Sequence, residues 1–133
     1  MNINLIKLLL KLKNASLVRK EVISIQCNTL CLELLKVLYQ EGFIQSFNVS
    51  SINSNTIEKQ FEITVVLRYF YNKPILKNLK IISTPSYVKY VTLKDLCKIP
   101  NKKRVLFLST NKGFLTGFGC KQKQVGGTLL FLI

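Results

Sequence analysis

The chain of 133 residues contains no histidine and no tryptophan, and only six of its residues are acidic. Histidine is the side chain most often used as a general base and as a metal ligand, so its absence removes the usual starting point for both kinds of site. Only one acid, Asp95, lies in the second half of the chain. These shortages predict a protein that is not an enzyme, with no cofactor and no small-molecule substrate.

Cysteine is also scarce, and its spacing does not suit a metal site. The chain has four cysteines and no C-x-x-C pair. A zinc site without histidine would need all four thiolates from scattered positions, so we predict buried free thiols and no metal site. Free thiols fit a reducing compartment. No apolar stretch approaches the roughly 20 residues that a membrane-spanning helix needs. The cysteines are Cys27, Cys31, Cys97 and Cys120.

What the chain has in excess is positive charge, and the excess lies in one half. There are 20 Lys+Arg residues against 6 Asp+Glu, for a formal net charge of +14. Residues 1–67 contain seven basic and five acidic side chains, whereas residues 68–133 contain thirteen basic side chains and one acid. Such a chain is expected to bind a polyanion, with nucleic acid the first candidate and an anionic membrane surface the second.

Hydrophobic periodicity predicts an α+β fold with two small α/β lobes. In the N-terminal lobe, residues 1–78, leucines at helical spacing predict a first helix over residues 2–16, and a second apolar stripe predicts a helix ending near Gly42. Alternation predicts a strand over residues 61–70. Residues 50–56 are expected to form a loop and residues 74–79 to be extended, which gives the order α-β-α-β-β.

The C-terminal lobe, residues 79–133, is predicted to be mostly β. Short apolar runs at residues 80–83, 87–91, 105–108 and 129–133 indicate strands. Thr92 is a good N-cap for a helical turn over residues 93–97.

The segment that follows residues 105–108 has the composition of a ligand-binding turn. Small hydroxyl and amide side chains can donate to phosphates or base edges, a lysine adds charge, and a glycine allows positive φ or a close approach. A second glycine pair could contribute in the same way. A hairpin turn and a flexible joint explain the same residues equally well, so composition leaves both interpretations open. The residues are Ser109, Thr110, Asn111, Lys112, Gly113, Gly126 and Gly127.

Other cations and two tyrosines of this lobe are further candidates. Long basic side chains suit phosphates, which carry no sequence information. Tyr87 and Tyr90 could stack on a base or sugar, and core packing at a seam between the lobes explains them equally well. The cations are Lys102, Lys103, Arg104, Lys121 and Lys123.

Ser109 and Lys112 also match the S-x-x-K pattern of a serine nucleophile with a lysine base. The companion S-x-N, at residues 46–48, precedes this pair where it should follow it, and no K-T-G is present. The chain is also too short for that fold, so we reject an acyl-transfer enzyme.

Residues 109–116, STNKGFLT, followed by VGG at residues 125–127, closely resemble the C-terminal signature of the universal small-subunit ribosomal protein number eight family. Similar segments occur in the family's order at residues 9–15, 39–44, 64–71, 84–85, 90 and 93–99, so the resemblance covers essentially the whole chain. It implies a non-enzymatic protein of two α/β lobes that binds a helix in the central domain of small-subunit rRNA, supports assembly and contacts neighbouring ribosomal proteins.

The resemblance also assigns residues. It places rRNA contacts on residues 109–113 and a shaping role on Gly126 and Gly127. Lys11, Lys13 and Asn14 lie in the segment similar to the end of the family's first helix, and we include them as candidates. The family usually has an acid at the position of Thr128 and a glycine at the position of Ser86.

Abundant Lys, Asn and Ile, which have A/T-rich codons, suggest an organellar or otherwise A/T-rich genome, and we expect a mitochondrial ribosome over a plastid or bacterial one. The acid-free segment 2–16 could be a transit peptide. We favour the first helix of the domain, because the resemblance extends into it.

A stand-alone basic module that binds nucleic acid or an anionic membrane surface is the alternative. A membrane-surface protein is expected to hold its lysines on one amphipathic helix. Here the lysines are spread over predicted strands and loops, which favours RNA and predicts no membrane partner.

Overall fold

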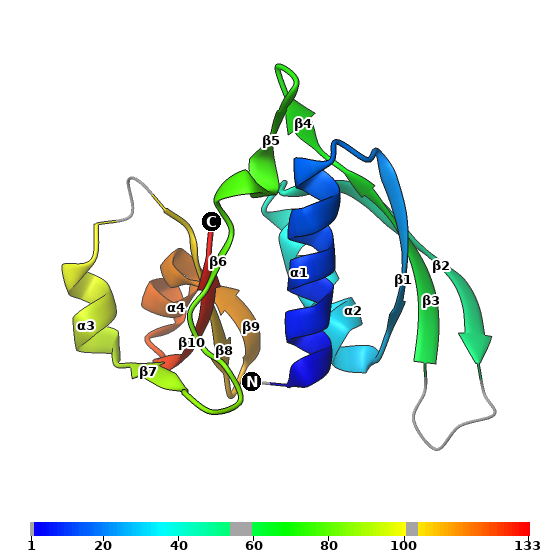
Figure 1. Cartoon of the computed structure of the whole chain (residues 1–133). Coiled ribbons are helices and arrows are strands. Elements are labelled where there is room, and N and C mark those ends of the chain that lie inside the picture. The colour runs from blue at the N-terminus through cyan, green and yellow to red at the C-terminus, as the bar shows by residue number, and fades with distance from the viewer. Residues whose placement is uncertain (1, 54–59, 101–103) are drawn as a thin grey trace. The chain divides into compact units, whose positions relative to one another are not determined.

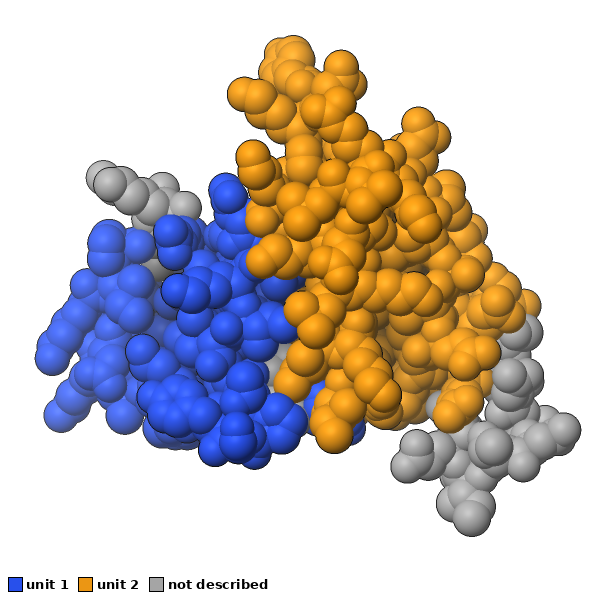
Figure 2. Space-filling model, viewed as in Figure 1, with its two compact units in different colours: residues 1–2, 78–133 blue, residues 3–77 orange. Residues whose placement is uncertain are grey.

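The computed structural model describes residues 2–53, 60–100 and 104–133. The chain divides into two compact units, an N-terminal unit of residues 3–77 and a C-terminal unit of residues 78–133 with residues 1–2 (Figure 2). Helices and sheets are both present, so the predicted α+β class is confirmed. That residues 79–133 act as a separate rRNA-binding lobe stays a prediction.

In the N-terminal unit two helices lie on one face of a three-stranded antiparallel sheet, whose strand order is β1-β3-β2 (Figure 1). A two-stranded hairpin, β4–β5, and a 3-10 helix, η1, follow this sheet. The elements are α1 (Ile3–Leu17), β1 (Val22–Cys27), α2 (Thr29–Gln40), β2 (Ile44–Asn53), β3 (Gln60–Leu67), β4 (Tyr69–Phe70), β5 (Lys73–Pro74) and η1 (Ile75–Asn78).

The core of this unit follows the predicted periodicity. Leu5, Leu8, Leu9 and Leu12 form the buried stripe of α1. On β3 the alternate residues Ile63, Val65 and Leu67 are buried in turn, as a half-covered strand requires. The side chain of Asn28 caps α2 by accepting a hydrogen bond from the Cys31 N–H at 3.1 Å.

Three local predictions for this unit were wrong. Strand β2 continues through Asn53, which pairs with Gln60, where a loop was expected over residues 50–56; residues 54–56 lie outside the described residues. The β2–β3 register shifts between Ile44 and Ser46 and again between Val49 and Ser51, and pairing resumes after each irregularity. The strand expected over residues 61–70 breaks after Leu67, and η1 replaces an extended segment.

In the C-terminal unit an antiparallel sheet has the order β6-β10-β8-β9, and β7 also pairs with β10. Helices α3 and α4 pack against it, and the core between them contains Val91, Leu96, Leu108, Cys120 and Leu129. The elements are β6 (Lys80–Ile81), β7 (Lys89–Val91), α3 (Leu93–Lys98), β8 (Leu106–Thr110), β9 (Gly113–Thr116), α4 (Gly117–Lys123) and β10 (Gly127–Leu132). Thr92 caps α3 as predicted.

Helix α4 was not predicted, because its sequence, GFGCKQK, contains two residues of low helix propensity. Two contacts explain why it forms. The Thr116 side chain caps it by accepting from the Gly119 N–H at 3.3 Å. A Cβ on Gly117 would lie 3.4 Å from the Cβ of Leu106, so the glycine lets the helix approach β8 closely.

Three of the four cysteines are buried free thiols, as predicted, whereas Cys97 is exposed. A hydrogen bond from Cys27 lowers the pKa of Cys31, and the same contact raises the pKa of Cys27. Burial raises the pKa of Cys120. Thiolate formation at Cys27 and Cys120 is therefore suppressed in the folded protein.

We expect a thiol reagent such as 5,5′-dithiobis(2-nitrobenzoate) to label one cysteine, Cys97, quickly in the native protein. Burial shields the other three thiols, so they should react only as the protein opens. The check is a count of released thionitrobenzoate with and without denaturant. A Cys97→Ser variant serves as the control, and rapid release of more than one equivalent from the native parent would contradict the buried placement.

Candidate nucleic-acid interface

The two segments singled out from the sequence meet at one hollow of about 420 Å³ on the C-terminal unit. Ser109, Thr110 and Asn111, at the end of β8 and in the turn after it, line one part of this hollow. Gly126 and Gly127, where α4 gives way to β10, line another part. The remaining lining residues are Tyr90, Val125 and Thr128.

Three hydroxyl-bearing residues of the hollow face one another across the sheet. Thr128 of β10 pairs with Tyr90 of β7 on one side and with Ser109 of β8 on the other. Directly opposed residues of antiparallel strands point to the same face, with Cβ atoms about 5 Å apart. Tyr90, Thr128 and Ser109 therefore form a row, which we call the hydroxyl row.

The glycine pair is needed because backbones approach closely at this point. A Cβ on Gly127 would lie 2.4 Å from the Ser109 carbonyl oxygen and 2.8 Å from the Thr110 Cγ2 atom. A Cβ on Gly126 would lie 2.9 Å from the Val91 carbonyl oxygen. These glycines thus let β10 enter between β7 and β8, which brings the hydroxyl row together.

The turn that joins β8 to β9 is held by one of its own side chains. The Thr110 hydroxyl donates to the Gly113 carbonyl at 2.9 Å and accepts from the Lys112 N–H at 3.2 Å. Gly113 has φ +96°, a left-handed conformation that favours glycine. Among the residues that the structure describes, the Ser109 hydroxyl has no hydrogen-bond partner, so it differs from Thr110 in being available to a ligand.

Neither Tyr87 nor Tyr90 is buried in the core of the C-terminal unit. Tyr87 is 63% exposed and Tyr90 is 66% exposed. Tyr90, which the sequence offered for stacking on a base without connecting it to residues 109–113, belongs to the hydroxyl row. Its position follows from the pairing of β7 with β10, which no local sequence signal reveals.

The other basic candidates of this unit differ in how free their side chains are to bind a phosphate. Lys112, Lys123 and Arg104 are exposed. Lys121 is half-buried, and its ammonium group donates to the Ile99 carbonyl at 3.0 Å, so it ties α4 to the residue that ends α3. Lys102 and Lys103 lie outside the described residues.

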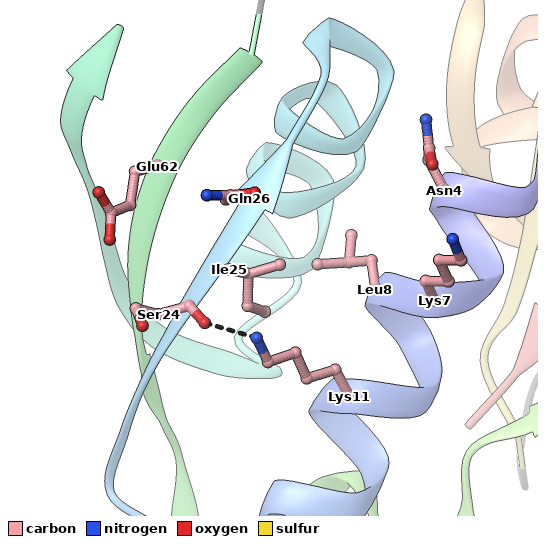
Figure 3. A pocket seen from close by; sticks show the side chains of 8 residues that line it. All are labelled: Asn4, Lys7, Leu8, Lys11, Ser24, Ile25, Gln26 and Glu62. Atoms are coloured by element: carbon pink, nitrogen blue, oxygen red, sulfur yellow. Dashed lines mark hydrogen bonds between the residues drawn. The ribbon is translucent and has the colours of Figure 1, made fainter. Parts of the chain in front are cut away.

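Lys11, Lys13 and Asn14 belong to α1 in the N-terminal unit and are not part of the hollow. Figure 3 shows a second, polar hollow beside α1, in which Lys11 reaches across to strand β1. Its ammonium group donates to the Ser24 carbonyl at 2.8 Å. Lys13 is half-buried and Asn14 is exposed.

Neither a metal cluster nor a membrane span is found in the part of the chain that the structure describes. These residues include no group of three or more His, Cys, Asp or Glu side chains that could hold a metal ion. None of their helices is long and apolar enough to cross a membrane.

Comparison with known proteins gives a consistent result. The sequence profile of ribosomal protein S8 matches residues 4–133. Small ribosomal subunit protein uS8 of Acholeplasma laidlawii is 37% identical over 124 residues, which cover 92% of this chain and 90% of the relative. The proteins of the same name from Vesicomyosocius okutanii and Pseudomonas aeruginosa are 33% and 32% identical over 123 residues, with the same coverage.

Proposed function

Since the chain belongs to the ribosomal protein S8 family, we propose that it binds small-subunit rRNA through the hollow that contains the hydroxyl row. The protein is a structural constituent of the small ribosomal subunit and not an enzyme. The RNA element that we propose is a helix of the central domain, bound in support of subunit assembly.

The observation that supports this proposal is the convergence of residues 109–111 and 126–127 on one hollow. The hollow combines short hydroxyl and amide side chains that can donate hydrogen bonds, backbone that a ligand can approach closely at the glycine pair, and the exposed aromatic ring of Tyr90. The deep major groove of regular A-form RNA is closed to short side chains, whereas a distorted or unpaired base can enter such a hollow. Exposed cations of the same unit, including Lys112, Lys123 and Arg104, are suited to phosphates.

Thr128 makes the hollow more favourable to an anion than the usual family residue would. A carboxylate between Tyr90 and Ser109 would repel a nearby phosphate, whereas the threonine hydroxyl can donate to it. None of the described residues that line the hollow is charged, and Asp95 is the only acid of residues 68–133.

We expect Ser109→Ala to reduce discrimination between the cognate rRNA helix and a scrambled helix by about 1–3 kcal/mol, because a buried partner on the RNA loses its hydrogen bond. Binding titrations of both RNAs at fixed salt provide the measurement. Ser50→Ala is the matched control, since the Ser50 hydroxyl bonds Thr64 in the N-terminal unit. Equal loss for both RNAs would show that Ser109 does not read the base.

We further propose that the ribosome is mitochondrial. The support is the abundance of Lys, Asn and Ile, while the relatives named above are bacterial. Co-localisation of the tagged protein with a mitochondrial marker, together with co-sedimentation with small subunits, is the expected result. Co-sedimentation without co-localisation would place the protein in another ribosome.

A further inference from the structure

The β4–β5 hairpin of the N-terminal unit exposes two aromatic rings that have no place in the function described so far. Phe70 is 64% exposed and Tyr71 is 83% exposed. The two rings contact each other edge to face, with centroids 4.4 Å apart and planes at 78°. In Figure 1 the hairpin projects beyond the sheet and helices of its unit. Ring faces at this tip therefore remain open to a ligand.

The conformation of the tip is costly for the residue that occupies it. Tyr71 has φ +48° and Asn72 has φ +60°, so both turn residues are left-handed, as in the type I′ turn of a two-residue hairpin. Asparagine tolerates this conformation, but a bulky aromatic residue rarely adopts it. Burial does not explain the tyrosine, because it is the most exposed of the large hydrophobic residues among those described. Strain of this kind at an exposed tip points to a function for the ring.

The hairpin is anchored at its base, and one exposed lysine lies on it and another follows it in the chain. The Tyr69 hydroxyl donates to the Lys20 carbonyl, and the Arg68 guanidinium donates to the Gly42 carbonyl at 3.2 Å. Lys73 pairs with Phe70 across the hairpin, so its side chain lies on the same face as that ring. Lys73 and Lys77 are exposed.

We propose that the tip formed by Phe70, Tyr71 and Lys73 is a second RNA contact, in which Tyr71 stacks on an unpaired base and Lys73 binds the adjoining phosphate. This inference rests on the proposed rRNA binding and adds a site on the other unit. Aromatic rings beside cations are the usual platform for single-stranded bases. The cations favour RNA over an apolar pocket on a neighbouring protein, because binding in such a pocket would desolvate Lys73 without a partner charge.

The test compares Tyr71→Gly and Tyr71→Phe in the full chain. Glycine suits the left-handed turn better than tyrosine does, so this variant removes the ring without weakening the hairpin. Phenylalanine keeps the ring. With purified small-subunit rRNA as the probe, we expect Tyr71→Gly to bind about 10-fold or more weakly and Tyr71→Phe to bind like the parent.

Two further readouts separate stacking from charge. The salt slope should stay unchanged in Tyr71→Gly and fall by about one phosphate contact in Lys73→Gln. Ultraviolet crosslinking of the parent should attach a nucleotide to the tryptic peptide of residues 69–77, and Tyr71→Gly should lose that adduct.

The outcomes distinguish this inference from the function on which it rests. If the parent protein does not bind rRNA, the proposed function fails. If the parent binds rRNA, three results bear on the tip: the affinity of the parent, the affinity of Tyr71→Gly and the crosslink at residues 69–77. Equal affinities together with no crosslink in the parent would overturn only the second contact. If Tyr71→Gly keeps its rRNA affinity but is lost from assembled subunits, the tip contacts a protein and the RNA proposal is wrong.

Discussion

Gly127→Ala should destabilise the protein by about 2–4 kcal/mol and abolish specific rRNA binding. The added Cβ would lie 2.4 Å from the Ser109 carbonyl oxygen, which is backbone and has no rotamer to change. Strand β10 must then move away from β8, and this separates Thr128 from Ser109 in the hydroxyl row. Urea unfolding followed by circular dichroism measures the stability, and a titration with the cognate RNA measures binding.

Two controls test the stated cause. A Cβ added at Gly113 meets no atom within 4 Å. Gly113→Ala should therefore lower the free energy of unfolding by only about 1–2 kcal/mol, because alanine disfavours the left-handed φ of this position. Adding Thr110→Ser to Gly127→Ala removes the second clash, with Cγ2, but leaves the carbonyl in place, so little stability should return. If Gly127→Ala costs no more than Gly113→Ala, the close approach of β10 to β8 does not govern the site.

Raising monovalent salt from 50 to 200 mM should weaken binding of the cognate rRNA by ~60- to 1,000-fold. This range corresponds to log–log slopes of roughly −3 to −5, which contacts with on the order of five phosphates would produce by counterion release. The basic half of the chain, with thirteen cations against one acid, can supply that number. Equilibrium binding at several salt concentrations gives the slope directly.

Single-lysine variants identify which cations contribute to that slope. Lys123→Gln should reduce its magnitude by about 0.7–0.9, because Lys123 is exposed on α4. Lys121→Gln should change the slope less and the stability more, because its ammonium group already bonds the Ile99 carbonyl. Salt-independent binding, or equal affinity for any DNA duplex, would contradict recognition of structured RNA by the basic half of the chain.

The sequence predicted those elements whose signal is local. The leucine stripe of α1, the alternation along β3 and the Thr92 cap of α3 were all read correctly, because each depends on spacing within a few residues. Helix α4 was missed, because a contact with Leu106 and a cap from Thr116 outweigh the low propensity of its glycines. Such tertiary contacts leave no periodic signal in the segment itself.

The candidate site was predicted as separate pieces. Composition indicated residues 109–113 and the two glycines, but the strand register that places Tyr90 beside Thr128 and Ser109 is a property of the sheet. Sequence alone also assigned equal roles to Ser109 and Thr110. The structure separates them, because the Thr110 hydroxyl holds its own turn through Gly113 and Lys112.

The position of β10 in its sheet has a consequence for synthesis of the protein. This strand is the latest in sequence of the C-terminal unit, yet it is the one that pairs with β6, β7 and β8. The N-terminal unit has all of its strands by residue 77 and can fold while the chain is still being made. The sheet that carries the hydroxyl row lacks its central strand, β10 (Gly127–Leu132), until these residues have emerged from the ribosome that makes the chain. A nascent chain arrested before that point would be half folded, with the apolar faces of β8 and β9 open, and it could not yet recognise its RNA.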